Sequence, residues 1–448
     1  MGSTGLNKAR DKMAAAGVDE VAIETFAHYY RLLEHGETGL IPESTIEPVD
    51  LDALRDVEVS DDDAAAAIRT TAVIKLNGGL GTSMGMDRAK SLLCVRRGLS
   101  FLDIIARQVL HLRTEYDAPL PLLFMNSFRT SADTMAALAR YEELPVEGLP
   151  LEFLQNKEPK LLAKDLSPAS WPKDPDLEWC PPGHGDLYVA LQTSGMLQSL
   201  LDRGVEAAFV SNSDNLGAVL DPRILHHFLD SGAPFLMEVV PRTQADRKGG
   251  HLARRKEDGR LVLRETAQTD EEDLEALQDT SRHRYSNTNN LWVNLVALDR
   301  VVRERSGVLG LPIIVNRKTV DPGDKSTPEV FQLETAMGAA ISVFEGAEAI
   351  EVSRRRFAPV KTTNDLLVLR SDFYTLTDRA HVEPAEGREP GSILVDLDPD
   401  HYKLLADFDA RFPAGAPSLA ECSRFVVRGD VTFGPDVAVR GQAELEAG

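Results

Sequence analysis

Short apolar runs alternate with helical stretches through the middle of this 448-residue chain, and this alternation restricts the fold more than any other feature. Such alternation is typical of α/β domains, in which right-handed crossovers join the strands of a mostly parallel sheet. Ligands of these sheets bind beyond the carboxyl ends of the strands. The apolar runs are residues 72–76, 120–125, 206–211, 234–240 and 291–298, and the helical stretches are residues 101–113, 186–203, 222–231 and 329–343.

The two ends of the chain differ from this core. Residues 1–68 carry an apolar stripe at helical spacing, which predicts an N-terminal helical segment before the α/β domain at residues 69–385. Residues 386–448 form a third region. Its segment 429–441 repeats small apolar residues about every six positions, which is typical of one or two coils of a left-handed β-helix.

The charge balance narrows the possible ligands. The chain carries 71 Asp and Glu against 49 Lys and Arg, a net charge of −22, and such a surface repels nucleic acid and anionic lipid. We therefore expect no nucleic-acid or membrane partner, and a nucleotide would need local cations and backbone donors. Three scattered cysteines predict neither disulfides nor a cysteine zinc site, so we expect a cytoplasmic protein.

A glycine-rich segment follows the first apolar run directly. Residues 76–85 read Leu-Asn-Gly-Gly-Leu-Gly-Thr-Ser-Met-Gly, and Lys90 follows them. Glycines let backbone N–H groups approach a polyphosphate, and a lysine adds a point charge. The segment matches neither the P-loop nor the dinucleotide fingerprint. A tight turn without a ligand is the alternative interpretation.

A carboxylate follows the third apolar run. Asp214, in Ser-Asn-Ser-Asp-Asn at residues 211–215, stands where it could hold Mg²⁺ through one oxygen. An Asx-type turn that closes the strand is the alternative.

The segment 76–85 with Lys90 resembles the nucleotide loop of the UTP–glucose-1-phosphate uridylyltransferase family of eukaryotic type. Further blocks recur in the family's order over about residues 70–375 and weakly to residue 440. The resemblance implies a nucleotidyltransferase-like mixed sheet flanked by helices. It also implies Mg²⁺-dependent transfer from UTP to glucose 1-phosphate, with release of pyrophosphate. One departure is Arg88-Ala89, because the family usually has Gly-Pro before the lysine.

The resemblance also implies roles for individual residues. The catalytic set is Lys90, Lys361 and Asp214, with Asp214 as the metal ligand. The nucleotide-binding set is Leu76, Asn77, Gly78, Gly79, Met125, Gln155 and Gly183. The sugar-phosphate-binding set is His184, Asn212, Glu238, Gly250, Asn287, Asn289, Asn316 and Lys318. Without the family context, Gln155 would be a strand-end amide bonded to backbone, and His184 a structural or surface residue.

The implied reaction is an in-line attack of the sugar phosphate on the α-phosphorus, which needs positioning and charge neutralisation but no general base. Other readings keep the chemistry with GTP, or with galactose or N-acetylglucosamine 1-phosphate. A different class of protein, a non-catalytic nucleotide or sugar-phosphate sensor, would not need the metal aspartate. A purely structural β-helix is disfavoured because the repeat is short. Relatives associate through the β-helix, and this tail is short, so we expect a monomer or a weak homo-oligomer.

Overall fold

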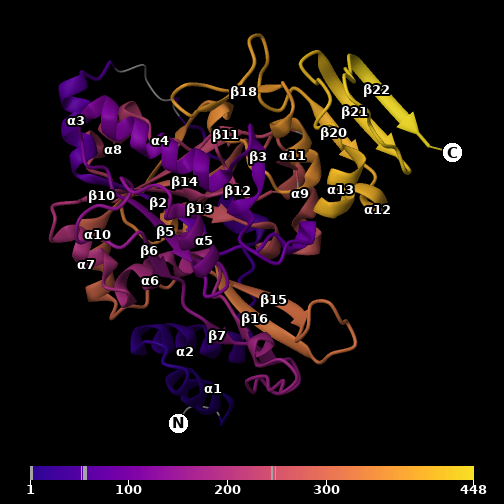
Figure 1. Cartoon of the computed structure of the whole chain (residues 1–448). Helices are drawn as coiled ribbons and strands as arrows, with labels where there is room; N and C mark the ends of the chain where they lie inside the picture. Colours follow the sequence, from indigo (N-terminus) through magenta and orange to yellow (C-terminus); the bar gives the residue numbers. More distant parts are fainter. Residues whose placement is uncertain (1–3, 52, 54–57, 244–245, 248, 448) are drawn as a thin grey trace. The chain divides into compact units, whose positions relative to one another are not determined.

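The computed structural model describes residues 4–51, 53, 58–243, 246–247 and 249–447. The chain divides into two compact units. The first unit comprises Met1–Asp56, Phe153–Val210 and His227–Glu351, and the second comprises Val57–Glu152, Ser211–His226 and Val352–Gly448. The architecture is the expected mixed α/β type, in which sheets are flanked by helices (Figure 1).

Strand β14 (Tyr285–Asn294) organises the first unit. It runs antiparallel to β10 (Ala207–Asn212), β11 (Phe235–Pro241) and β12 (His251–Arg255). The other strands of this unit are β1 (Ile46–Glu47), β7 (Glu158–Pro159), β8 (Leu161–Leu162), β9 (Trp179–Cys180), β13 (Leu261–Arg264), β15 (Ile313–Thr319), β16 (Glu329–Thr335) and β17 (Glu348–Glu351). β11 and β17 are parallel, so the sheet of this unit is mixed.

The register between β11 and β14 slips at one point. Glu238 pairs with Asn290, but the next residue, Val239, pairs with Asn287. Thr288 and Asn289 are therefore extra residues on β14, and Asn289 takes a left-handed backbone conformation with φ of 59°. Bulges of this kind redirect side chains and are common beside functional sites.

Two N-terminal helices cover one side of the first unit. α1 (Thr4–Ala15) and α2 (Glu20–Glu34) lie together in Figure 1. They bury Phe26 and Tyr30 with Leu161, Ile313 and Leu333 of the α/β part. Apolar burial of this kind stabilises by about 25 cal/mol per Å², so the predicted N-terminal helices pack on the unit instead of standing apart. The remaining helices of this unit are α6 (Leu187–Thr193), α7 (Met196–Leu201), α9 (Leu274–Gln278) and α10 (Leu295–Glu304).

One predicted helix is wrong. Residues 329–343 form strand β16 followed by a short 3-10 helix at Met337–Ser342. β16 pairs antiparallel with β15 over its whole length, and with β8 on its other side. Tertiary pairing therefore overrides an apolar pattern that local sequence leaves ambiguous. In two further cases the expected bounds change: 186–203 breaks at Gly195, with φ of 72°, and 291–298 is half strand and half helix.

The second unit begins its α/β core with β2 (Thr71–Asn77), all of whose residues are buried. β2 pairs in parallel with β5 (Leu122–Asn126), as the sequence predicts, and the crossover contains α4 (Phe101–Tyr116). The other helices are α3 (Asp61–Arg69), α5 (Ser131–Leu138), α11 (Thr363–Arg370), α12 (Pro399–Tyr402) and α13 (Leu405–Arg411). Helix α8 (Pro222–Ser231) begins in a segment of the second unit and ends in a segment of the first. The short strands β3 (Cys94–Arg96), β4 (Leu99–Ser100), β18 (Tyr374–Leu376) and β19 (Val382–Pro384) form two small hairpins, and β6 (Glu152–Leu154) ends the second unit's first segment.

Three parallel strands end the chain. β20 (Leu394–Leu397), β21 (Cys422–Arg428) and β22 (Gly441–Glu446) lie side by side at the C-terminus (Figure 1). Phe425, Val426 and Val427 of β21 are fully buried. In the first unit, β12 and β13 form an antiparallel hairpin.

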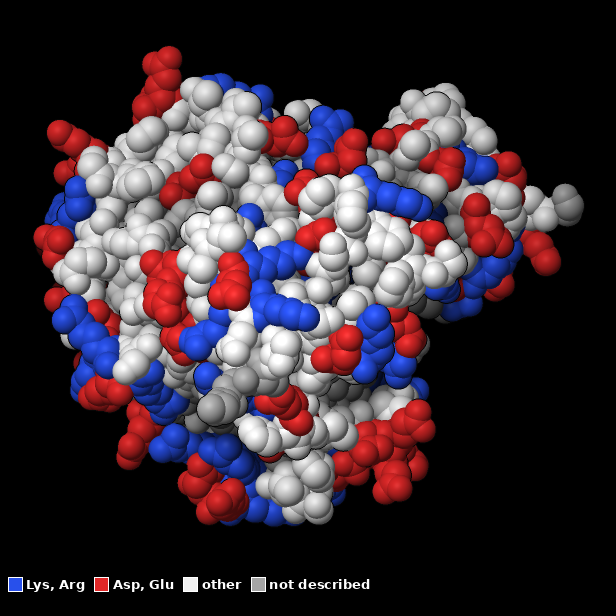
Figure 2. Space-filling view, turned by 90° about the horizontal axis from the view of Figure 1, so that it is seen from below, with Lys and Arg blue, Asp and Glu red and all other residues white. Residues whose placement is uncertain are grey.

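Among the described helices, none combines the length and the apolar character that crossing a bilayer requires. Figure 2 shows Lys and Arg side chains scattered among Asp and Glu side chains on the face drawn. Attraction of an anionic ligand to this face would therefore depend on local groups.

Candidate active site

Two of the three predicted catalytic residues, Lys90 and Asp214, are in contact in the second unit. The ammonium of Lys90 forms an ion pair with Asp214, with Nζ and Oδ2 2.7 Å apart, and also donates to the backbone carbonyl of Val360. The Lys90 backbone N–H donates to Gly79 O at 3.1 Å, and Val360 N–H donates to Asp214 O at 3.1 Å. We call Gly79, Lys90, Asp214, Val360 and the following Lys361 the phosphate cluster.

Buried amide side chains fix the start of the glycine loop. Asn77, only 2% exposed, donates through Nδ2 to Asn126 Oδ1 at 2.8 Å and to Thr134 Oγ1 at 2.9 Å. Ser127 Oγ donates to Gly78 O, and Ser213 N–H donates to Leu76 O. Leu76, Asn77 and Gly78 thus have well-defined backbone positions where the strand ends, and Gly79 has open space beside its Cα.

The side-chain amide of Asn215 bonds to the segment that precedes Lys361. Asn215 Nδ2 donates to Arg356 O at 3.0 Å, and Asn215 Oδ1 accepts from Ala358 N–H at 3.0 Å. These bonds hold the segment that carries Lys361 beside the segment that carries Asp214. Lys361 itself is exposed, and its backbone N–H donates to Asp365 Oδ2 at the start of α11.

Two further predicted residues of this unit differ in burial. Met125 is 2% exposed in β5, where it pairs with Leu76. Asn212 is half-buried at the end of β10, and its carbonyl accepts from Asn215 N–H at 3.3 Å.

Asp214 offers the ligand chemistry of a magnesium site. Its side chain is 22% exposed, so an oxygen can reach a bound ion. Among the described residues, no group of three or more His, Cys, Asp or Glu side chains is arranged to hold a metal. A single carboxylate still fits Mg²⁺, which proteins usually bind through one or two carboxylates together with substrate phosphates and water.

In the first unit, the segment Pro181–Asp186, which we call the glycine turn, presses against β16. Thr335 N–H donates to Pro182 O at 3.0 Å. Gly183 has φ of 80°, and a Cβ there would lie 2.6 Å from Thr335 O. A Cβ on Gly185 would also collide with Thr335. Only glycine therefore allows this close approach of two backbones.

His184 of the glycine turn has a defined tautomer. Its Nδ1 accepts from Met337 N–H at 3.0 Å, so the proton of the neutral ring lies on Nε2. Burial lowers the pKa of His184 to about 4, so the ring is neutral near pH 7. It can donate a hydrogen bond to an anion without carrying a charge.

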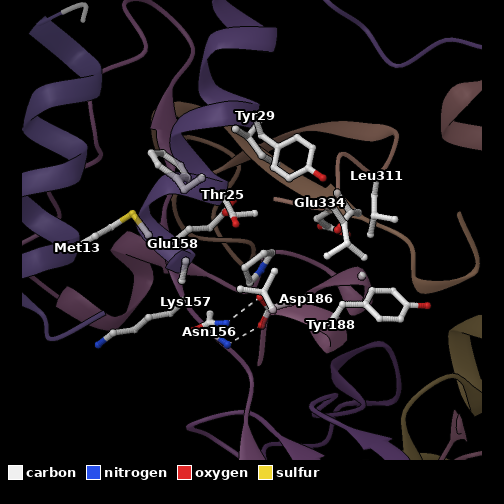
Figure 3. A pocket seen from close by; sticks show the side chains of 18 residues that line it. Met13, Thr25, Tyr29, Asn156, Lys157, Glu158, Asp186, Tyr188, Leu311 and Glu334 are labelled. Atoms are coloured by element: carbon white, nitrogen blue, oxygen red, sulfur yellow. Dashed lines mark hydrogen bonds between the residues drawn. The ribbon is translucent and has the colours of Figure 1, made fainter. Parts of the chain in front are cut away.

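The predicted base-reading residue bonds to the glycine turn. Gln155 Nε2 donates to Gly183 O at 2.9 Å. The next residue, Asn156, donates to Asp186 twice, from its backbone N–H to Oδ2 at 2.6 Å and from Nδ2 to Oδ1 at 2.9 Å (Figure 3). Burial raises the pKa of Asp186 to about 7, and the hydrogen bonds from Asn156 oppose that shift.

The predicted sugar-binding amides stand at the bulge of β14. Asn287 Nδ2 donates to Asn289 Oδ1 at 2.8 Å, and Asn289 N–H donates to Asn287 Oδ1 at 2.8 Å. A Cβ on Gly338 would lie 2.9 Å from Asn287 Nδ2. Glu238 is fully buried, and its two oxygens accept from Asn290 Nδ2 and Trp292 Nε1.

The other predicted sugar-side residues lie on two separate elements. Asn316 and Lys318 share one face of β15, and Lys318 Nζ is 3.7 Å from Glu334 Oε1 on β16. Gly250 precedes β12, where a Cβ would collide with the Glu265 carboxylate. Contacts thus connect Gln155, Gly183 and His184 in one group, whereas Glu238 of β11 is bonded to β14 and Gly250 lies against Glu265.

Three contributors escaped the sequence reasoning. Asn156, Asp186 and Asn215 lie within two residues of predicted ligand residues, but no role followed for them. Their partners are 30 residues apart for Asn156 and Asp186, and 141 residues apart for Asn215 and Arg356. An acid or amide directly beside a predicted ligand residue was the only available signal.

A protein-family model matches most of the chain. The model described as UTP–glucose-1-phosphate uridylyltransferase matches residues 23–440. The chain belongs to the UTP–glucose-1-phosphate uridylyltransferase family. The members of this family are transferases, and so is this chain.

Named members of the family cover most of the chain. The UTP–glucose-1-phosphate uridylyltransferase of Hordeum vulgare is 41% identical over 411 residues, which are 91% of this chain and 82% of that protein. The enzyme of Saccharomyces cerevisiae is 41% identical over 83% of this chain and 72% of its own length. A variant of the UDP-glucose pyrophosphorylase of Leishmania major, solved in complex with UDP-glucose, has a TM-score of 0.93 at 44% identity, covering 99% of this chain and 95% of that chain.

Proposed function

We propose that the chain joins UTP to α-D-glucose 1-phosphate and releases pyrophosphate, as the names of its relatives describe. The observation that carries this proposal is the phosphate cluster. It brings Gly79, Lys90 and Asp214 together from segments more than a hundred residues apart, with Lys361 directly after Val360. Family membership supplies the substrates, and the cluster supplies the groups that their reaction needs.

The reaction needs no covalent intermediate. An oxygen of the sugar phosphate attacks the α-phosphorus of UTP, and the bond from that phosphorus to the bridging oxygen of the β-phosphate breaks. The attacking oxygen is already anionic, so no residue has to remove a proton. Negative charge grows on the departing pyrophosphate, and positioned cations lower the barrier by offsetting it.

We assign Lys90 and Lys361 to this neutralisation. In the structure, the Lys90 charge is balanced by Asp214. A triphosphate would compete for Lys90, and Asp214 would then be available as the carboxylate of a Mg²⁺ site. When bound, Mg²⁺ would neutralise phosphate charge. The half-buried pair thus keeps both charges compensated before substrate arrives.

The nucleotide would contact backbone groups of Leu76, Asn77, Gly78 and Gly79. Met125 would lie beneath these residues, and Gln155 and Gly183 would contact the nucleobase. The neutral His184 would donate Nε2–H to the sugar phosphate. For the sugar and its phosphate we propose the remaining set of Asn212, Glu238, Gly250, Asn287, Asn289, Asn316 and Lys318. The buried position of Glu238 favours an indirect role, in which it orients Asn290.

Each of the three regions of the chain has an expected role. We propose that residues 1–68, 69–385 and 386–448 act as helical segment, catalytic domain and C-terminal domain. The parallel strands β20, β21 and β22 would be the coils of a short left-handed β-helix. A monomer or a weak homo-oligomer is expected, and light scattering over a range of concentrations measures it.

A substrate panel tests the proposal. Purified protein is given Mg²⁺ with each of UTP, GTP, CTP and ATP against glucose, galactose and N-acetylglucosamine 1-phosphates, and pyrophosphate is measured. UTP with glucose 1-phosphate should give the highest kcat/KM. A higher value for another pair would replace the substrates, and binding without pyrophosphate release in any pair would identify a sensor.

A further inference from the structure

The contact between Asn156 and Asp186 sits next to the residue that we assign to the base. Asn156 follows Gln155 in the chain, and Asp186 ends the glycine turn that begins at Pro181. Both carboxylate oxygens of Asp186 are used by Asn156, one by its backbone and one by its side chain. We call this pair of hydrogen bonds the clamp.

The Gln155 amide is bonded to the glycine turn through its nitrogen. With the backbone of Asn156 tied to Asp186, Gln155 Nε2 reaches the carbonyl of Gly183 at 2.9 Å. The amide nitrogen is then turned towards the protein, which leaves Oε1 as the acceptor for a ligand. An acceptor at this position selects a base edge that carries a ring N–H. Uracil N3 and guanine N1 carry a hydrogen, whereas cytosine N3 and adenine N1 are acceptors.

We propose that Asp186 and Asn156 are positioning residues that set base specificity, because the clamp fixes the Gln155 amide with its oxygen towards the nucleotide and so favours UTP over CTP. This inference rests on the proposed function, in which Gln155 contacts the base. It goes beyond that function by naming what orients the amide.

The far side of the glycine turn is already immobile. Thr335 N–H bonds Pro182 O, and Met337 N–H bonds His184 Nδ1. Gly183 has no room to move towards Thr335. The turn therefore acts as a fixed support, and the clamp transmits its position to the base-reading segment.

A small cavity lies beside the clamp. A cavity of about 30 Å³, room for one or two water molecules, is lined by Asp186, Asn156, Glu158 and Tyr188 (Figure 3). Glu158 is 3% exposed, its Oε1 has no hydrogen-bond partner, and burial together with the Asp186 charge raises its pKa. Without the donors of Asn156, the Asp186 carboxylate would have room to turn.

Reversing the two partners provides the test. Asn156→Asp places two carboxylates against each other, so the clamp should open. We expect the ratio of kcat/KM for UTP to that for CTP to fall at least about tenfold, the loss of roughly one good hydrogen bond. The KM for UTP should rise, while kcat at saturation stays within about threefold of the wild type.

The double variant Asn156→Asp with Asp186→Asn restores the pairing. The introduced amide donates to the introduced carboxylate, and its oxygen accepts from the backbone N–H at position 156. The UTP-to-CTP ratio should return to within about threefold of the wild type. Assays run at pH 8, above the Asp186 pKa of about 7, so that the wild-type carboxylate is ionised.

Lys157→Ala is the matched control. Lys157 is the next residue along the chain and lies over the ring of Trp179, with Nζ 4.8 Å from the centroid, so its loss leaves the clamp intact. Its UTP-to-CTP ratio should equal that of the wild type. If Asn156→Asp fails to fold in a thermal melt, Asn156→Ala, which removes only the side-chain donor, should lower the ratio about threefold.

The outcomes separate the two proposals. A wild-type protein that releases no pyrophosphate from UTP refutes the proposed function. A wild type that uses UTP and CTP equally, or a folded Asn156→Asp variant with an unchanged ratio, refutes only the specificity role. A double variant that folds but stays unselective shows that Asp186 acts through the fold alone.

Discussion

The phosphate cluster of the second unit and the glycine turn of the first unit are held by opposite means. In the cluster, an ion pair joins side chains from distant segments, and Lys90 and Asp214 remain 16% and 22% exposed. In the turn, backbone hydrogen bonds and missing Cβ atoms fix the chain against β16. A charge pair can exchange partners when a ligand arrives, but a close backbone contact cannot.

Mutations in the two regions should therefore affect different properties. Loss of a charge in the cluster should act on turnover, because neutralisation matters most when charge develops in the transition state. Loss of fit at the turn should act on stability and on nucleotide binding.

Replacing Lys361 by Ala should reduce kcat by about 10²–10³, the usual cost of losing a group that stabilises developing charge. The side chain is exposed, so the unfolding temperature should hardly change. Pyrophosphate release at saturating substrate measures the effect. Near-full turnover would remove Lys361 from the cluster.

Replacing Gly183 by Ala should lower the free energy of unfolding by about 1–3 kcal/mol more than Gly195→Ala does, because overpacking adds to the backbone cost. Both glycines have positive φ, of 80° and 72°. A Cβ meets Thr335 at Gly183, whereas it meets open space at Gly195. Urea unfolding of the two variants measures the difference, to which the steric contact and the backbone cost of ψ of 176° at Gly183 against 3° at Gly195 both contribute. Equal losses would show that the close approach does not matter.

Replacing Asp186 by Asn should flatten part of the stability profile between pH 5 and pH 8. Burial raises this pKa from 3.8 to about 7, so the folded chain keeps a proton that the unfolded chain releases. Wild-type stability therefore falls as pH rises from about 4 to about 7.

The variant lacks this ionisation, so its stability relative to the wild type should improve by at least about 1 kcal/mol between pH 5 and pH 8. Urea unfolding at both pH values measures the difference. An identical difference at the two pH values would mean that Asp186 ionises normally. In that case, burial in the glycine turn would not disfavour the charged form of Asp186.

Replacing Arg355 by Ala should change little. Its side chain is 52% exposed and pairs with the exposed Glu389 at 3.1 Å, and such pairs contribute at most about 1 kcal/mol. Pyrophosphate release should stay within about twofold of the wild type. A large loss of turnover would extend the phosphate cluster to this exposed cation.

Sequence predicted the parts of the site that are written in one stretch. The glycine loop follows β2 directly, so an apolar run and the glycines after it were enough. The ion pair of Lys90 and Asp214 joins residues 124 positions apart, and only the family resemblance linked them beforehand. The clamp at Asp186 was missed because neither partner signals the other locally.

The fold shows the same division. β2, β5, β10 and β11 fall on the predicted apolar runs. β16 was predicted as a helix, because the choice between helix and strand there depends on its neighbours β15 and β8. The antiparallel course of β14 also depends on partners that local pattern cannot reveal.

The bulge in β14 has a consequence for shortening the chain. Side chains of a strand alternate in direction, so deleting Thr288 alone would exchange inside for outside along one arm of β14 and threaten buried Trp292. Removing Thr288 and Asn289 together would preserve the parity of the strand. Thr288 and Asn289 can thus be deleted as a pair, which would remove one residue of the proposed sugar-binding set while the sheet keeps its register.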